Sequence, residues 1–264
     1  MSINNLLKAV FLLLIFIFNV TAFDVLAKND KSAPHVQTDR GLLNASARGR
    51  LHDVRRLLNN GARPNAIVQD KNKRSALILA SAADHENVVL ELLQFGADIN
   101  YKDSAGLSAI SWSAILGNNK VAKRLVMWNA DINQHDNNGN TPLMYAVGTN
   151  NIELLKMLAL KGADLDAKSR VQKMTPMLVA IKNNEIEIIQ ELLQLGANVN
   201  SANHEGYTPL MAAAESGHRL IVQTLIAHGA KKNVYDVTGM TARILAKKNG
   251  HTQVEQILKL SPHR

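Results

Sequence analysis

The sequence predicts an all-α solenoid of about seven short helix-turn-helix units with projecting turns, preceded by a cleavable signal peptide. The 264 residues include 46% hydrophobic and 20% charged side chains, which supplies enough apolar material for a sizeable core. Aromatic residues make up only 4% and there are six prolines, a composition that disfavours a β-sandwich or a collagen-like chain. A small dipeptide that recurs every 33 to 35 residues favours a repeat architecture over a single globular enzyme.

The N-terminal residues have the pattern of an export signal. Lys8 and the amino terminus provide positive charge, the apolar run 9–18 follows, and small residues end at Ala22 and at Ala27. We expect cleavage after residue 22 or residue 27, so that residues 1–27 form the signal peptide. The apolar run has about half of the roughly 20 residues that a membrane-spanning helix needs. A retained membrane anchor is the alternative, and no stable membrane span is expected after cleavage.

Charge and cysteine content limit the compartment and the partners. Loss of residues 1–27 removes one base and one acid from 30 Lys+Arg and 22 Asp+Glu, so the net charge stays at +8. The chain has no cysteine, which excludes disulfides, thiolate metal sites and a cysteine nucleophile. An exported protein without disulfides fits the bacterial periplasm or secretion from a bacterium. The basic excess allows an acidic partner, but export and the lack of a recognised nucleic-acid motif argue against nucleic acid.

Three columns of residues recur along the rest of the chain. A Gly-Ala or Asn-Ala dipeptide recurs at steps of 35, 33, 33, 34 and 33 residues, and an Asn or Asp lies four residues after its first member. A Thr or Ser, in three repeats followed by proline, marks a third position. The dipeptides are Gly61-Ala62, Gly96-Ala97, Asn129-Ala130, Gly162-Ala163, Gly196-Ala197 and Gly229-Ala230.

These columns predict helix boundaries. The Thr or Ser starts a first helix, because its hydroxyl caps backbone N–H groups and proline at the first helical position fixes φ. A turn such as Gly217-His218 leads into a second helix with aliphatic spacing, which packs antiparallel to the first. The glycine of the dipeptide ends this second helix in the left-handed conformation, which Asn129 also tolerates. Polar segments such as 136–139 and 236–239 then project as turns between repeats.

Together these motifs resemble the ankyrin-repeat signature. The resemblance rests on Gly139-Asn140-Thr141-Pro142-Leu143 and Gly206-Tyr207-Thr208-Pro209-Leu210, with Gly217-His218 and Gly229-Ala230. It implies a repeat domain over residues 38–260, with a cap at each end, after a short linker at 28–37 and before a tail at 261–264. The expected repeats are 38–67, 68–100, 101–133, 134–166, 167–200, 201–233 and 234–260.

The resemblance implies binding rather than catalysis. Ankyrin stacks present turn tips and the exposed side of the first helices as a concave surface to a protein partner, and the family has no shared catalytic residues. We therefore expect a monomeric, non-enzymatic scaffold without cofactor or metal that binds another protein. Register places the candidate partner-binding residues in turns and at helix ends: Lys102, Leu107, Ile115, Leu116, Trp128, His135, Asn140, Arg170, Lys173, Tyr207 and Tyr235.

Ile115 and Leu116 are the most informative of these candidates. Two large aliphatic residues, where consensus repeats tolerate polar ones, suggest an apolar hot spot beside Leu107, with Trp128 at the end of the same repeat. The alternative is that they pack on the next repeat. Trp112 occupies a column filled elsewhere by aliphatic residues, so we expect it in the core.

A second functional hypothesis rests on basic turns. Several Lys and Arg residues lie within residues 71–74 and within residues 168–173. They would suit an envelope-associated accessory protein that binds an anionic surface. Ordinary solvated charge that keeps a repeat protein soluble is the simpler interpretation.

Motifs for chemistry are missing from the sequence. His85-Glu86 resembles the start of a zinc-protease helix, but Val89 stands where the second histidine is required. His218 and His251 stand at the turn into a second helix, where we expect them to cap and pack. The sequence contains neither a phosphate-binding loop nor a Gly-x-Ser-x-Gly nucleophile elbow.

Overall fold

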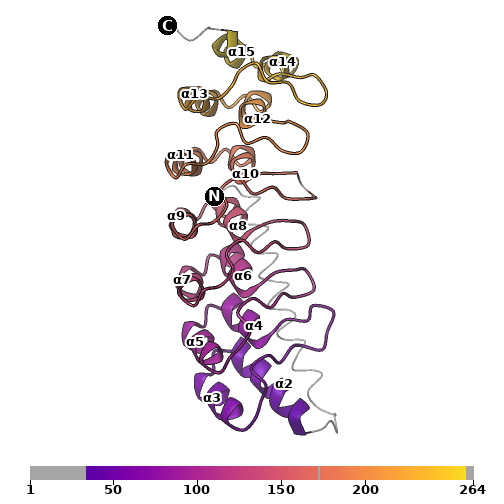
Figure 1. The fold of residues 1–264 in the computed structure, drawn as a ribbon, viewed down its shortest axis with the longest axis vertical. Helices are drawn as coiled ribbons and strands as arrows, with labels where there is room; N and C mark the ends of the chain where they lie inside the picture. Colours follow the sequence, from indigo (N-terminus) through magenta and orange to yellow (C-terminus); the bar gives the residue numbers. More distant parts are fainter. Residues whose placement is uncertain (1–33, 172, 260–264) are drawn as a thin grey trace. The chain divides into compact units, whose positions relative to one another are not determined.

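The computed structural model describes residues 34–171 and 173–259, which form helices joined by turns and loops (Figure 1). Fourteen α-helices and no strand occur in this part of the chain, apart from one isolated β-bridge between Ile67 and Ser75. The expected all-α class is confirmed. The expected signal peptide and tail lie outside the described residues. Among the helices that are described, none is long and apolar enough to cross a membrane.

The chain divides into two compact units, which meet in the sequence between Asn137 and Asn138. In the described part of the first unit, α2 packs on α4 and α4 on α6, while α3 packs on α5 and α5 on α7. The first helices thus form one layer and the second helices another (Figure 1). α2 begins within the residues expected as a linker. The bounds are α2 Pro34–Ala47, α3 Leu51–Asn59, α4 Ala76–Ala82, α5 Glu86–Gln94, α6 Ala109–Leu116 and α7 Asn119–Met127.

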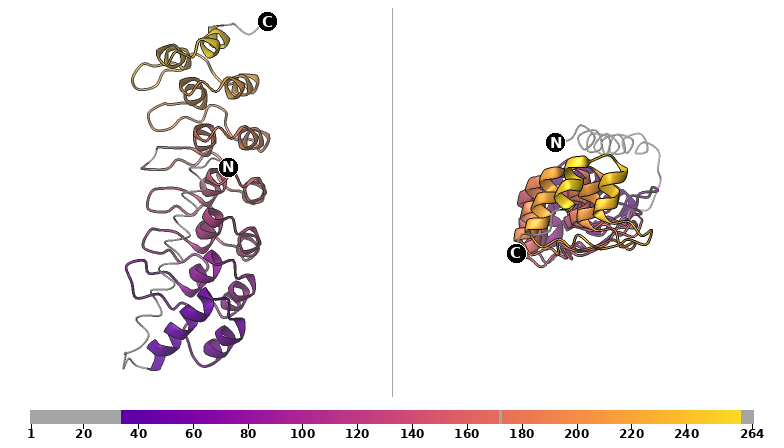
Figure 2. Two further views of the ribbon diagram at one scale, coloured as in Figure 1. Left: turned by 180° about the vertical axis from the view of Figure 1, so that it is seen from behind. Right: turned by 90° about the horizontal axis from the view of Figure 1, so that it is seen from above.

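The second unit repeats this arrangement. First helices α8, α10, α12 and α14 pack in series, and second helices α9, α11, α13 and α15 form the parallel series (Figure 2, left). The bounds are α8 Pro142–Gly148, α9 Ile152–Leu160, α10 Pro176–Lys182, α11 Ile186–Gln194, α12 Pro209–Glu215, α13 Arg219–Ala227, α14 Ala242–Lys248 and α15 Thr252–Lys259.

Hydroxyl side chains start the first helices as expected. The backbone N–H of Ile78 donates a 3.2 Å hydrogen bond to the hydroxyl of Ser75, and Thr141, Thr175, Thr208 and Thr241 cap their helices in the same way. Ser108 differs, because its hydroxyl lies 3.2 Å from that of Ser111 and caps no helical N–H. The column therefore satisfies orphan donors at five of these six helix starts.

The second helices end at residues in the left-handed region. Gly229 has φ of +89° and Asn129 has φ of +59°, so the expected glycine cap and its Asn substitute are confirmed. The N–H of Ala230 then donates to the carbonyl of Leu225 at 2.9 Å, which closes the helix end in a Schellman-type bond.

The Asn column links successive repeats. Oδ1 of Asn65 accepts a 2.7 Å hydrogen bond from the N–H of Asp98, and Oδ1 of Asn100 accepts one of 2.9 Å from the N–H of Asp131. In the second unit Asn200 binds the N–H of Lys231 in the same way at 2.8 Å. Each such side chain satisfies a backbone donor of the next repeat, which explains the recurrence of this residue type.

Histidines at the start of second helices have a packing role. Nε2 of His251 lies 2.9 Å from the carbonyl oxygen of Glu215, at the end of the first helix of the preceding repeat. Its ring leaves no room for a side chain at Gly217. His85 makes the corresponding contact with the carbonyl of Ala47 at 3.2 Å. Burial, followed by the charge of His251, lowers the pKa of His218, which therefore stays neutral at neutral pH.

Candidate protein-interaction surface

The turns between repeats are held by a side-chain oxygen at their first residue. Oδ1 of Asp103 accepts hydrogen bonds from the N–H groups of Ala105 and Leu107 at 2.9 and 3.0 Å. Asp236 accepts from Thr238 and Met240 in the same pattern, and the Thr238 hydroxyl contributes most to the lowered pKa of Asp236. A turn with these internal bonds presents its tip in a defined conformation.

Backbone hydrogen bonds join several neighbouring turns within each unit. In the first unit the N–H of Ser104 donates to the carbonyl of Asn72 at 2.9 Å. In the second unit the N–H of Val237 donates to the carbonyl of Glu205, also at 2.9 Å. Neighbouring tips are therefore fixed relative to each other, and their outward side chains form a row that a partner can contact.

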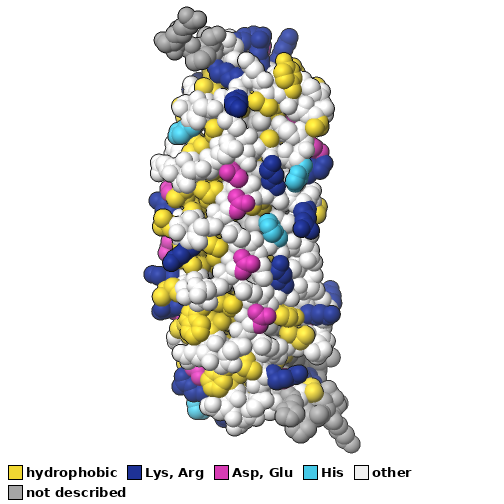
Figure 3. Space-filling model, in the orientation of Figure 1, with side chains coloured by type: hydrophobic (Ala, Val, Ile, Leu, Met, Phe, Trp, Pro, Cys, Tyr) yellow, Lys and Arg dark blue, Asp and Glu magenta, His cyan; other side chains and the backbone are white. Residues whose placement is uncertain are grey.

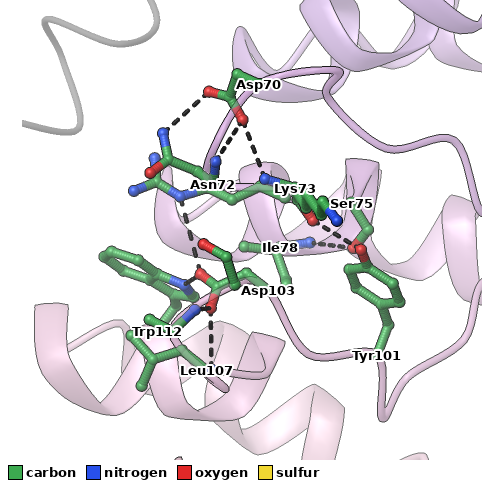
Figure 4. A network of polar contacts seen from close by, with 12 residues as sticks. Asp70, Asn72, Lys73, Ser75, Ile78, Tyr101, Asp103, Leu107 and Trp112 are labelled. Carbon is green, nitrogen blue, oxygen red and sulfur yellow. Dashed lines mark hydrogen bonds and ion pairs between the residues drawn. The ribbon is translucent and has the colours of Figure 1, made fainter. Parts of the chain in front are cut away.

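A buried polar network anchors the turn at residues 70–75 to the following repeat (Figure 4). Nε1 of Trp112 donates a 2.9 Å hydrogen bond to Oδ2 of Asp103, and the guanidinium of Arg74 lies 4.6 Å from the centre of the indole ring. The hydroxyl of Tyr101 donates to the carbonyl of Lys73 at 2.8 Å. Trp112 is buried, so its expected place in the core is confirmed.

Arg74 does not lie where the basic-turn hypothesis expected it. It was grouped with exposed basic residues of its turn, but its side chain is buried between Trp112 and Asp103. Burial lowers the pKa of Arg74, and the charge of Asp103 opposes that shift. A signal was present, because Arg74 occupies the position that Leu107 and Met174 fill in other repeats.

The apolar hot spot expected around Ile115 does not form on the surface. Ile115 is 7% exposed and Leu107 is 8% exposed, and Leu116 is half-buried. Packing covers Ile115 and Leu107, whereas Leu116 is only partly covered. The prediction that Ile115 and Leu107 contact a partner directly is therefore wrong, because both side chains are buried.

Trp128 lies in the second-helix layer. It follows α7 and is 42% exposed, next to the exposed side chain of Met127. Phe95 occupies the equivalent position after α5 and is also exposed. These residues form exposed apolar positions on second-helix ends, separate in sequence from the turns and first helices.

The turn candidates in the first unit are accessible. Lys102 and His135 are both exposed, and Nζ of Lys102 donates a 2.8 Å hydrogen bond to the backbone carbonyl of His135. This bond places two candidate residues from neighbouring turns side by side.

In the second unit, the turn candidates fall into two groups. Arg170 is exposed and Tyr235 is 66% exposed, whereas Asn140 and Tyr207 are half-buried. Lys173 forms an ion pair with Glu205 of the next turn. The Tyr207 hydroxyl donates to the Glu215 carboxylate, and burial, followed by this hydrogen bond, raises the pKa of Tyr207. Tyr207 therefore acts as a neutral donor at physiological pH.

Charged groups are spread over the surface rather than gathered into a reactive site. Basic, acidic and hydrophobic side chains all occur along the face shown in Figure 3. Across the described residues, no group of three or more His, Asp or Glu side chains is placed to hold a metal ion.

The pairing of two short helices with a projecting turn, repeated through both units, is matched by a family model. The model for ankyrin repeats in three copies matches residues 2–103, 102–169 and 159–236. The chain belongs to the ankyrin-repeat family. Ankyrin repeats are generally protein-protein interaction modules, and the fold is typically a non-enzymatic scaffold.

Solved structures show the same fold. This ankyrin-repeat chain is similar to the crystal structure of the ankyrin repeat domain of Bcl-3, described as a unique member of the IkappaB protein family, with a TM-score of 0.77 and 27% identity. The similarity covers 88% of this chain and 100% of that domain. No curated protein matches the chain.

Proposed function

We propose that this ankyrin-repeat chain is a non-enzymatic scaffold that binds a partner protein through its turn tips and first helices. The observation that supports this most strongly is that each unit contains rigid turns. Their backbone bonds fix neighbouring tips, while candidate residues such as Lys102, Arg170 and Tyr235 remain exposed. A preorganised surface of this kind loses little conformational entropy on binding.

The alternative, binding of an anionic surface through basic turns, has less support. In the turn at residues 71–74, Arg74 is buried against Trp112. In the turn at residues 168–173, Lys173 forms an ion pair with Glu205. Both contacts reduce the positive charge that these turns offer to a polymer or lipid surface.

Chemical crosslinking in the native compartment, followed by mass spectrometry, tests the proposal. A single protein crosslinked to turn residues supports it, whereas recovery only with envelope polymer supports the alternative. Lys102→Glu and Arg170→Glu should each reduce recovery of the partner. Lys123→Glu, which changes an exposed lysine on α7, is the control with the same charge change.

We also propose that the chain acts after export, in a bacterial periplasm or outside the cell. The support is the apolar run 9–18 with small residues at Ala22 and Ala27, together with the lack of cysteine. N-terminal sequencing of the mature protein should begin at residue 23 or residue 28. An intact Met1 would contradict export by this signal.

A further inference from the structure

The outer side of the last repeat differs from the same side of the other repeats. In five first helices the third residue after the Ser or Thr cap is no more than 4% exposed; these residues are Ile78, Ser111, Met144, Leu178 and Met211. The equivalent residue of α14, Ile244, is 42% exposed. In the second unit no described element lies over this side of α14 and α15 (Figure 2, right).

Part of this outer side is built as a polar cap. Leu210 of α12 and Val222 of α13 are almost fully buried, but the equivalent residues of the last repeat are Arg243 and Glu255. Nε of Arg243 lies 3.7 Å from Oε1 of Glu255, and Lys259 binds the same carboxylate at 2.8 Å. Charged residues in place of buried apolar ones make the outer side of a terminal repeat soluble. Ile244 has kept its apolar character without being covered.

The turn that precedes α14 adds two exposed apolar side chains. Tyr235 is 66% exposed and Val237 is 73% exposed. Counted back from the Ser or Thr cap, the Val237 position holds Lys71, Ser104, Asn137, Val171 or His204 in the other turns, so it is polar in all but one of them. Because the bonds to Asp236 keep this turn in one conformation, its apolar side chains are presented on a rigid element, as binding anchors usually are.

Basic residues outnumber acidic ones around this end of the second unit. Residues 201–259 contain seven Lys and Arg but only four Asp and Glu, a balance of +3. The acids all have partners within the chain: Glu205 with Lys173, Glu215 with Tyr207, Asp236 with its own turn, and Glu255 with Arg243 and Lys259 and, more weakly, with the charge of Lys247.

Two of the lysines lie beside Ile244. Lys247 and Lys248 are exposed, three and four residues after Ile244, and therefore share its helix face. Basic and hydrophobic side chains occur together over this end of the molecule in Figure 3.

We propose that Tyr235, Val237, Ile244, Lys247 and Lys248, here called the end face, bind an acidic amphipathic segment of a partner protein. The segment would lay apolar side chains on Ile244 and the turn, and its carboxylates would meet the two lysines. A second copy of this chain is a poorer occupant, because it carries a net charge of +8. The inference rests on the proposed protein-binding function and adds the place and chemistry of the contact.

Fluorescence anisotropy with the full mature chain tests the end face. The probe is a labelled amphipathic helical peptide of Leu and Glu, compared with the same peptide carrying Lys in place of each Glu. The acidic peptide should bind and the basic one should not. Ile244→Ser, and Lys247→Glu combined with Lys248→Glu, should each weaken binding about tenfold or more.

Matched control variants keep this test specific. Leu220→Ser removes an apolar side chain that is 61% exposed on α13, and Lys182→Glu reverses an exposed charge at the end of α10. Both should leave binding unchanged. Equal binding of the two peptides, or equal losses from control and end-face variants, would overturn the inference. Self-association that Ile244→Ser abolishes, measured by analytical ultracentrifugation, would overturn it in favour of a second copy.

Failure of this inference can be separated from failure of the proposed function. If a crosslinked protein partner binds wild type and end-face variants equally, the end face is not its site but the scaffold function stands. If no protein partner is recovered and the acidic peptide does not bind, both are contradicted.

Discussion

Oδ2 of Asp103 accepts a 2.9 Å hydrogen bond from Nε1 of Trp112, while Oδ1 of the same carboxylate accepts from two N–H groups of its own turn. Asp103 thereby joins a turn to the first helix that follows it. Its carboxylate also lies 4.0 Å from Nε of the buried Arg74 and supplies the opposite charge there. One side chain thus supports turn geometry, helix packing and a buried cation.

Asp103→Ala is expected to lower the free energy of unfolding by about 3–5 kcal/mol, because it leaves a buried charge without its partner. Trp112→Phe keeps an aromatic ring under Arg74 and removes the indole N–H, so it should cost only about 1–2 kcal/mol. Urea denaturation followed by circular dichroism measures both. A loss from Asp103→Ala no larger than that from Trp112→Phe would contradict this role.

Gly217 and Gly229 provide a matched pair for the role of His251. A Cβ at Gly217 would lie 2.5 Å from Nδ1 of His251, whereas a Cβ at Gly229 meets nothing within 4 Å. Both residues have positive φ, so each alanine costs about 1–2 kcal/mol for the left-handed backbone. Gly217→Ala should cost clearly more in thermal or urea unfolding, and His251→Ala in the same chain should remove the excess. Equal costs for the two glycines would rule out the steric contact.

Mutation of Ile115 should lower the free energy of unfolding more than mutation of Trp128. Ile115 is 7% exposed, so Ile115→Ala is expected to lower the free energy of unfolding by about 2–4 kcal/mol. Trp128 is 42% exposed at a helix end, so Trp128→Ala should cost less than about 1 kcal/mol. Urea titrations of the two variants measure this. If Ile115→Ala left stability unchanged but reduced partner binding, the hot-spot hypothesis would regain support.

Glu91 should make the stability of the first unit depend on acid pH. Arg55 donates two hydrogen bonds of 2.9 and 2.7 Å to its carboxylate, which lowers the pKa of Glu91 although burial opposes the shift. Because this pKa is lower in the folded than in the unfolded state, the stabilisation is present above the ordinary Glu pKa of about 4.3 and is lost as pH falls through the lowered value.

Glu91→Gln should therefore flatten the fall in unfolding free energy between about pH 6 and about pH 3. Glu187→Gln, at an exposed position on α11, is the control. Burial and, less strongly, the charge of Glu187 raise the pKa of Glu185, so this variant removes only that repulsion and should change the profile less than Glu91→Gln does. Urea titrations at several pH values measure the effect. Identical profiles for wild type and Glu91→Gln would show that the pair contributes no pH-dependent stability.

Helix boundaries were predictable because they depend on residues close together in the sequence. Thr208 caps the start of α12, and Gly229 follows the end of α13 in the left-handed conformation. The hydrogen bonds at both positions span only a few residues. The Asn column could be located but not explained, because its partner is a backbone N–H in the next repeat, as with Asn100 and Asp131.

Burial was less predictable, because it depends on what packs over a side chain. The same column of first helices is buried at Met211 and exposed at Ile244, although both residues are apolar. The positions of Ile115 and Leu107 in the repeat predicted that both lie on the surface, yet packing covers them. Charge type was misleading at Arg74, whose guanidinium is stabilised by an aromatic face and a carboxylate rather than by solvent.

Site-specific photocrosslinking tests the central claim, that this chain recognises a protein through its turns and first helices. A photoreactive amino acid would replace Tyr235, which is 66% exposed in a turn, or Leu220, which is 61% exposed on a second helix. We expect one crosslinked protein from position 235 and none from position 220. Crosslinks from position 220 alone, or no protein product at either position, would contradict it.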